Sequence, residues 1–139
     1  MNNINNLIEN HFFSMRVWND NYGKGLFVCL SPNSLLLNCV EDNLEAGDLD
    51  MIPSSEYLLS TNWLPICIGN NLTDALSKLE HRLDALPKNE LKRNSDWSNA
   101  IFAALEHLRD VSDENRNYGG LEGNLNQLSD DYKLVFNNK

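Results

Sequence analysis

The chain has 139 residues, a length that fits one domain and is too short for two well-packed domains. Its net charge of −9 and sequence pI near 4.6 are the opposite of what phosphate-backbone binding requires, so we expect no nucleic-acid partner. The sequence shows neither a signal segment at its N-terminus nor a run of about 18 apolar residues. We therefore expect a cytoplasmic, single-domain protein over residues 1–139 with no membrane partner.

The first half of the sequence predicts a helix followed by a small antiparallel sheet. Apolar residues at helical spacing predict a helix over residues 4–13. Turn-forming residues cluster over 19–25, and the apolar runs 26–30 and 35–40 then predict two strands that pair antiparallel. The acidic segment 41–50 is typical of a loop. Asn occupies 22 of the 139 positions and favours turns and helix caps, so we expect many loops.

Helices dominate the prediction for the second half. Residues 57–59 fit either a strand or the start of a helix, and residues 63–68 fit a strand. Apolar residues at helical spacing, each set preceded by a capping residue, predict helices over 72–86 and 95–111. Because the connection over 88–94 is short, we expect these two helices to pack as an antiparallel pair.

The order of these elements predicts an α+β fold, with a small antiparallel sheet in the N-terminal half packed by a helical C-terminal half. An all-α fold is the alternative, because Leu-rich runs do not distinguish a buried strand from a buried helix. Residues 112–139 fit a third helix, or a loop with a last strand.

The segment that starts at Asp42 comes closest to a metal-binding motif. It has an acid at position 1 and Gly47 at position 6, as a calcium loop does. Leu44 and Ala46, however, occupy two ligand positions, and Pro53 stands where the bidentate glutamate belongs. We therefore predict that this segment binds no calcium.

The cysteines and histidines lack the spacing of a zinc site or a catalytic pair. Cys29, Cys39 and Cys67 each lie in an apolar run, which predicts reduced thiols whose pKa is raised by burial. His81 and His107 each follow a glutamate on a predicted helix, and we expect them at the surface. We therefore predict no catalytic residue, no metal and no cofactor, and a protein that is not an enzyme.

The acids are concentrated in two segments, and no Lys or Arg lies between Lys24 and Lys78. Surface acids aid solubility without any partner, but acids with so few local counter-charges also complement a basic partner. Aromatic residues near acids supply buried area in interfaces, although a tryptophan is as commonly a core residue. The candidate partner-binding residues are Glu41, Asp42, Glu45, Asp48, Asp50, Asp110, Asp113, Glu114, Trp18 and Tyr22.

Small size, strong acidity, dispersed Asn, and the lack of an export signal and a catalytic motif together resemble bacterial immunity proteins of contact-dependent growth inhibition and related toxin systems. The resemblance covers the whole chain in character and includes no diagnostic motif. It implies a cognate toxin domain, often a cationic nuclease, that is bound tightly by a monomer. The acidic segments would then imitate the phosphate groups that the toxin expects, and the aromatic residues would supply buried area.

Two other interpretations stay open. The chain is also similar in character to type III secretion chaperones, which are small, acidic α+β proteins that act as dimers and hold an unfolded effector segment. A monomer in solution would count against that interpretation. A third is a regulatory or enzymatic domain, which requires a pocket of clustered ionisable groups with strongly shifted pKa values.

Overall fold

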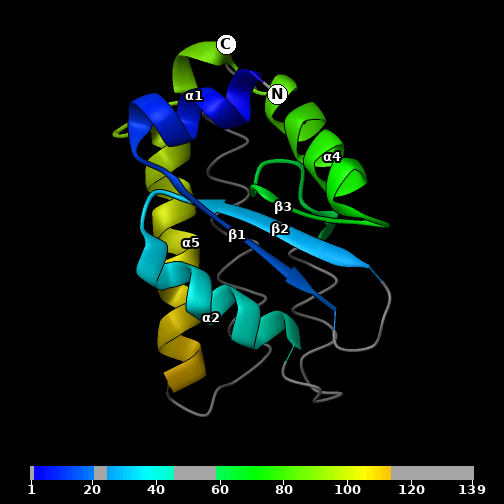
Figure 1. The fold of residues 1–139 in the computed structure, drawn as a ribbon. Coiled ribbons are helices and arrows are strands. Elements are labelled where there is room, and N and C mark those ends of the chain that lie inside the picture. Colours follow the sequence, from blue (N-terminus) through cyan, green and yellow to red (C-terminus); the bar gives the residue numbers. More distant parts are fainter. Residues whose placement is uncertain (1, 21–24, 46–58, 114–139) are drawn as a thin grey trace.

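A three-stranded antiparallel sheet lies at the centre of the fold in the computed structural model (Figure 1). The structure describes residues 2–20, 25–45 and 59–113, of which 39, 42–45 and 107–113 are described by backbone alone. The strands follow the order β1-β2-β3, so that β2 is central: β1 (Ser14–Asn19), β2 (Leu26–Ser31) and β3 (Ile66–Gly69).

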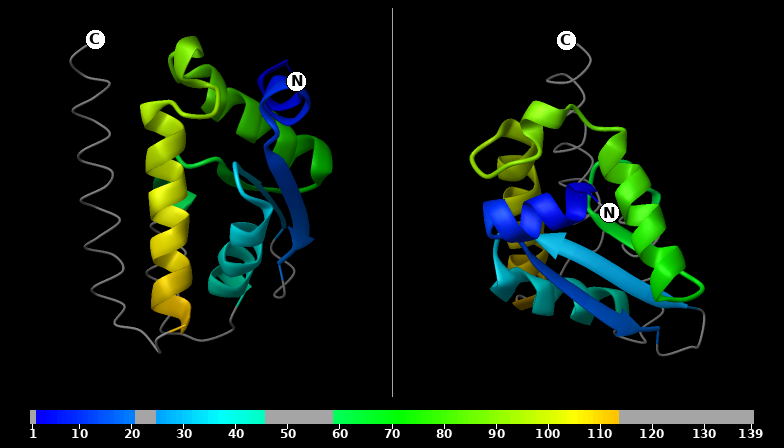
Figure 2. Two further views of the ribbon diagram at one scale, coloured as in Figure 1. Left: turned by 90° about the vertical axis from the view of Figure 1, so that its left-hand side faces the viewer. Right: turned by 45° about the horizontal axis from the view of Figure 1, so that its top comes forward.

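Helices surround this sheet and make up most of the regular structure, so the fold is α+β, as predicted. In the views of Figures 1 and 2, α2 packs against β1, β2 and α5, whereas α4 packs along β3 and β2 and also carries α1. The helices are α1 (Asn2–His11), α2 (Ser34–Glu45), α4 (Leu72–Asp84) and α5 (Asp96–Asp113), with a short 3₁₀ turn, η2 (Lys88–Glu90).

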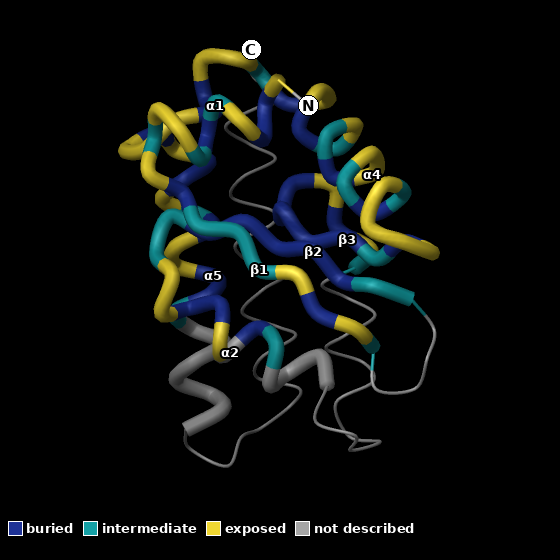
Figure 3. Tube along the Cα trace, viewed as in Figure 1, coloured by how far each residue is buried: buried dark blue, intermediate teal, exposed yellow. Residues whose placement is uncertain are grey.

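Strand β2 is buried on both faces, as the dark tube in Figure 3 shows. The neighbouring residues Val28 and Cys29 are both fully buried, and consecutive strand side chains point to opposite faces. Helices therefore cover both sides of the central strand. The largest fully buried side chains around it include Trp63 and Trp97, far apart in the sequence.

The segment predicted as a second strand over 35–40 is helical in the structure and forms most of α2. Leu36, Leu37 and Val40 are buried while Leu35 is 73% exposed, which is the pattern of one helix face. The Asn33 side-chain oxygen accepts the Leu35 N–H at 2.9 Å and caps the helix start. The prediction was wrong because a short Leu run carries no period that separates strand from helix.

The strand that pairs with β2 on this side is instead β1, for which the sequence predicts no element. The two strands pair from Ser14↔Ser31 to Asn19↔Leu26. The predicted loop over 41–50 is also wrong as far as residue 45, because α2 continues to Glu45. The strand over 63–68 is confirmed in its second half by β3.

Helices α4 and α5 confirm the two predicted helices, but they pack chiefly against different elements and do not form an antiparallel pair. The connection between them is itself structured. The Glu90 carboxylate accepts the Trp97 N–H at 3.1 Å, and the Trp97 indole N–H donates to the Trp63 carbonyl at 2.9 Å. These bonds direct α5 away from α4 and toward α2, so a short connection alone does not determine how two helices pack.

Helix starts in this fold are satisfied by acids and small polar side chains. The Glu80 carboxylate, on α4, accepts the N–H groups of Asn3 at 2.6 Å and Ile4 at 3.1 Å, and so caps α1 from a distant segment. Asn71 caps α4 by accepting the Asp74 N–H at 2.8 Å. Such bonds satisfy N–H groups that a helix leaves without partners in its first turn.

Gly69 permits the first turn of α4 to lie directly against the end of β3. A Cβ atom at Gly69 would lie 2.4 Å from the Ala75 backbone nitrogen and 2.6 Å from its Cα. Gly69→Ala should therefore lower the free energy of unfolding by roughly 1–3 kcal/mol, since a backbone contact cannot give way cheaply. Urea unfolding followed by circular dichroism tests this, with Ser77→Ala on the exposed face of α4 as control. Equal midpoints for Gly69→Ala and wild type would contradict it.

Phe12 ends α1 in a left-handed backbone conformation, with φ of 61°, that usually belongs to glycine. Its side chain is 72% exposed, so little packing offsets the strain. We expect Phe12→Gly to raise the free energy of unfolding by about 0.5–1 kcal/mol. Phe12→Ala, which removes the ring but keeps the strain, should give no such gain in the same urea titration. A gain of equal size in both variants would assign the effect to the ring.

Candidate protein-binding surface

Glu41 is the one predicted acid whose side-chain surroundings are described. It lies on α2, about one third exposed, and its carboxylate oxygen is 3.7 Å from the Arg16 guanidinium of β1. Arg16 also donates a hydrogen bond to Asn38 on the same helix. An ion pair this exposed contributes little stability. Glu41 is therefore tied to β1 and at the same time partly open to solvent.

Helices α2 and α5 both end with acids and without a basic residue. The last turn of α2 contains Asp42 and Glu45, and the last turn of α5 contains Asp110 and Asp113. The C-terminal end of a helix carries a partial negative charge, so an acid there costs about 0.3–1 kcal/mol at an exposed site. Four of the predicted acids thus stand where helix stability disfavours negative charge.

Two of the arginines are directed at backbone carbonyls instead of acids. The Arg82 guanidinium, half-buried beside β3, donates to the carbonyls of Leu64 at 2.7 Å and Leu59 at 3.2 Å. Arg93 donates to the Pro32 carbonyl at 2.9 Å. These two positive charges therefore stabilise the fold through backbone carbonyls.

The acids of α4 form a separate, local set with Lys78 of the same helix and Lys88 of η2. Lys78 pairs with Asp74 at 3.2 Å and Lys88 pairs with Asp84 at 2.9 Å. The Asn70 N–H, and then Lys78, hold the pKa of Asp74 below its usual range, while Lys88 and then Asn3 do the same for Asp84. Together with Glu80, these acids have structural partners and do not belong to the candidate binding surface.

Trp18 does not offer the exposed aromatic face that the sequence analysis assigned to it. The residue is 9% exposed and its ring stacks on Phe27 of β2, with centroids 5.2 Å apart. Its indole nitrogen is buried with no hydrogen-bond partner. Strand β1 turns Trp18 toward the core, so Trp18 is a core residue, which was the alternative interpretation of the sequence.

Other predicted site residues fall outside the part of the chain that the structure describes. These are Tyr22, Asp48, Asp50 and Glu114. The structure in turn brings forward a residue that the sequence analysis missed, Val17, which is 39% exposed on the edge strand β1. Its signal in the sequence is the alternation of Met15, Arg16 and Val17, which is too short to predict a strand against the neighbouring turn cluster.

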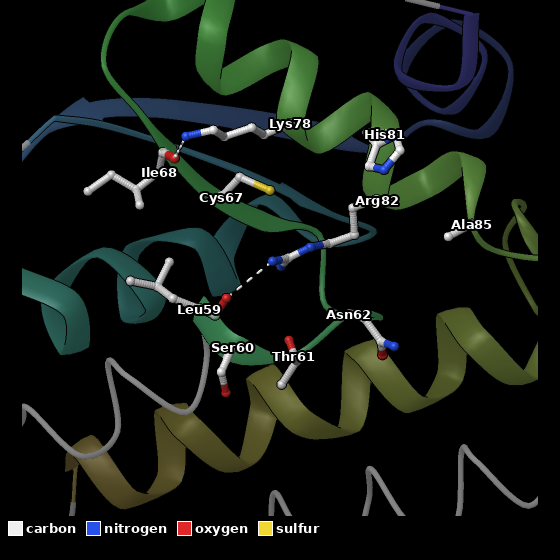
Figure 4. A pocket seen from close by; sticks show the side chains of 10 residues that line it. All are labelled: Leu59, Ser60, Thr61, Asn62, Cys67, Ile68, Lys78, His81, Arg82 and Ala85. Atoms are coloured by element: carbon white, nitrogen blue, oxygen red, sulfur yellow. Dashed lines mark hydrogen bonds between the residues drawn. The ribbon is translucent and has the colours of Figure 1, made fainter.

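A pocket of about 550 Å³ lies at the other edge of the sheet, between β3, α4 and the segment before β3 (Figure 4). The thiol of Cys67 faces it, and burial raises the pKa of that thiol although Arg82 and Lys78 oppose the shift. The thiol is therefore protonated at neutral pH and is a poor nucleophile. The pocket is lined by Leu59, Ser60, Thr61, Asn62, Cys67, Ile68, Lys78, His81, Arg82 and Ala85.

The predicted core thiols are confirmed where they can be observed. Cys29 and Cys67 are free and buried, and burial raises the pKa of Cys29 as well. Cys39 belongs to a part of α2 described by backbone alone. His81 is exposed, as predicted, while the side chain of His107 lies outside the described ones.

Comparison of the chain with protein-family models, with curated proteins and with solved structures found no match. Within the described ranges, no helix has the length and apolar character needed to span a membrane. In the same ranges, no three His, Cys, Asp or Glu residues gather as a metal ion would need. What the protein binds is therefore inferred from its charges and its surface.

The acids at the end of α2 should oppose folding, which the double variant Asp42→Asn/Glu45→Gln tests. We expect its free energy of unfolding to rise by about 0.3–1 kcal/mol, because the helix end then carries less negative charge. Asp96→Asn makes the same chemical change at the first turn of α5, where an acid is favourable, and should lower stability. Urea unfolding at low salt measures both, and a loss of stability in the double variant would contradict the expectation.

Proposed function

We propose that this protein is an immunity protein that binds and neutralises a cognate basic toxin domain of nuclease type through an acidic surface. The observation that carries the proposal is the charge at the end of α2. Three acids follow within five residues, Glu41, Asp42 and Glu45, in a stretch of more than fifty residues that contains no Lys or Arg.

The use of charge elsewhere in the fold supports this assignment. Glu80 and Glu90 cap helix starts. Asp74 pairs with Lys78 of α4 and Asp84 pairs with Lys88 of η2, so all four acids stabilise the fold. Glu41 of α2 pairs with Arg16 of β1 and stays about one third exposed, and the acids that follow it stand in the last turn of the helix, where negative charge is disfavoured. A surface of this kind attracts a basic partner and speeds its association at low salt.

In this proposal the acids imitate the phosphate groups of the nucleic acid that the toxin cleaves. Bound acids would occupy the basic site of the toxin and exclude its substrate by competition. Electrostatic steering accelerates association up to about 10⁸–10⁹ M⁻¹s⁻¹ at low salt, and the rate falls steeply as salt rises. Inhibition of a toxin inside the cell that produces it benefits from such fast capture.

The test is capture of the partner from the native cell at low salt by the tagged full chain, followed by elution with rising salt. We expect one basic protein in equimolar amount, which is toxic when expressed alone and harmless when expressed with this chain. Asp42→Asn/Glu45→Gln should slow association by about tenfold and flatten its salt dependence. The control pair Glu9→Gln/Asp96→Asn removes the same amount of charge on other helices. It should leave the association rate and its salt dependence unchanged.

Other outcomes would direct the assignment elsewhere. Capture of a second copy of this chain together with an unfolded effector segment would overturn the proposal in favour of a dimeric secretion chaperone. A captured partner with no toxicity of its own would also overturn it. Equal loss of association rate in the control pair would show that net charge, and not the end of α2, governs binding.

A further inference from the structure

The two edges of the sheet differ in how their backbone groups are satisfied. The Leu30 N–H of β2 donates to the carbonyl of Pro65, the residue before β3. The backbone N–H and C=O groups of residues 64, 66 and 68 therefore point away from β2. Arg82 donates to the carbonyls of Leu64 and Ile66, and Lys78 donates to that of Ile68 at 3.5 Å. Two cations of α4 therefore cover the outer edge of β3.

The outer edge of β1 has no such cover among the described residues. The backbone N–H and C=O groups of Leu30 point toward β3. The backbone groups of the alternate residues 27, 29 and 31 of β2 therefore point toward β1, where these residues pair with 18, 16 and 14. The backbone N–H and C=O groups of Met15, Val17 and Asn19 consequently point away from the sheet. β1 is the terminal strand in the described sheet, and no described element crosses in front of it in Figure 1.

The side chains along this edge leave room for another strand. Val17 is 39% exposed and Asn19 is exposed, whereas Met15 is half-buried against the core. Edge strands in natural proteins are usually blocked by charged side chains, a proline, a bulge or a covering element, because open edges pair with other chains. The one charged side chain of β1, Arg16, is held by Asn38 and Glu41 of α2. Between Ser14 and Asn19 β1 contains neither a lysine nor a proline, and its pairing with β2 is continuous, without a bulge.

Acids lie beside this open edge and determine which strand it would accept. The ion pair between Arg16 and Glu41 places α2 next to β1, and Asp42 and Glu45 follow in the last turn of that helix. In sequence, β1 and the part of α2 from Glu41 to Glu45 together contain one cation and three acids. An added strand gains main-chain hydrogen bonds from the edge and specificity from its side chains, so a strand with basic side chains is the complementary one.

We propose that the partner docks by adding a basic, extended segment to the outer edge of β1, where it extends the sheet to a fourth strand. This inference rests on the proposed function for the identity of the partner as a basic toxin domain. The backbone groups of Met15, Val17 and Asn19 hold the added strand, and the acids of α2 select basic side chains on it. The edge of β3 takes no part, because Arg82 and Lys78 already occupy its carbonyls.

The first test measures hydrogen exchange residue by residue in the ¹⁵N-labelled full chain. The probe is a synthetic nine-residue peptide of alternating lysine with valine or threonine, and a peptide with glutamate in place of lysine is its control. We expect the lysine peptide to slow exchange of the Met15, Val17 and Asn19 amides by about tenfold or more. The Arg16 and Trp18 amides, which already bond to β2, should change little, and the glutamate peptide should have no effect.

Two results would overturn the inference. One is exchange at Met15, Val17 and Asn19 that stays unchanged at millimolar lysine peptide. The other is slowing that needs no peptide and grows with protein concentration, since that would identify a second copy of this chain as the occupant. An effect of the same size from the glutamate peptide would leave the open edge in place but refute the selection by the acids of α2.

A second test uses Val17→Pro, which deletes an outward N–H without removing a bond between β1 and β2. Val17→Thr retains the N–H and the branched side chain and is the matched control. We expect the proline variant to lose peptide binding by about tenfold or more while the threonine variant retains it. If the proline variant fails to fold, as circular dichroism would show, the exchange pattern of the wild-type chain decides.

Failure of this inference can be told apart from failure of the proposed function. Capture of a toxic basic partner whose binding leaves the amides of β1 unprotected would refute only the docking mode. Protection of these amides by the lysine peptide, without any toxic partner from the native cell, would refute only the assignment as an immunity protein.

Discussion

The packing of α4 against the edge of β3 is the contact on which the remaining structure depends. Gly69 lets the first turn of the helix approach the strand, and Arg82, near the end of the helix, donates to the carbonyls of Leu64 and Ile66 at the start of the strand. The same helix presents Glu80 to the start of α1. One helix therefore closes a sheet edge and fixes the N-terminal helix, through backbone groups that would otherwise lack partners.

Charged side chains have two distinct uses in this protein. Those with structural work bind backbone groups or each other, as Arg82, Glu80 and Glu90 do. The acids in the last turns of α2 and α5 stand where helix stability disfavours negative charge. Net charge alone does not distinguish an acid that accepts backbone N–H groups from an acid in the last turn of a helix.

The two sheet edges follow the same division. At β3 the cations of α4 satisfy the outer carbonyls, so this edge is finished within the chain. At β1 the neighbouring helix brings Glu41 and its following acids close, and the outer backbone groups stay unpaired by any described strand. An acidic helix beside an open strand edge combines long-range attraction with a template for backbone pairing.

Local patterns in the sequence were enough for much of the fold. They predicted the α+β class, the helices over 72–86 and 95–111 that are α4 and α5, the strand over 26–30 that is β2, and the burial of Cys29 and Cys67. Each of these depends on spacing, capping or apolar character within a short window. The concentration of acids between 41 and 50 is likewise a property of the sequence alone.

Only the tertiary structure decided the remainder. It made residues 34–45 a helix, placed Trp18 in the core, and separated the acids that cap helices from those at the ends of α2 and α5. The bond from Asn3 to Glu80 joins residues 77 positions apart, and no local period encodes a contact of that separation. The sequence by itself determined where charge and helix-forming patterns lie, while packing decided which charged side chains bind backbone groups and which strand ends the described sheet.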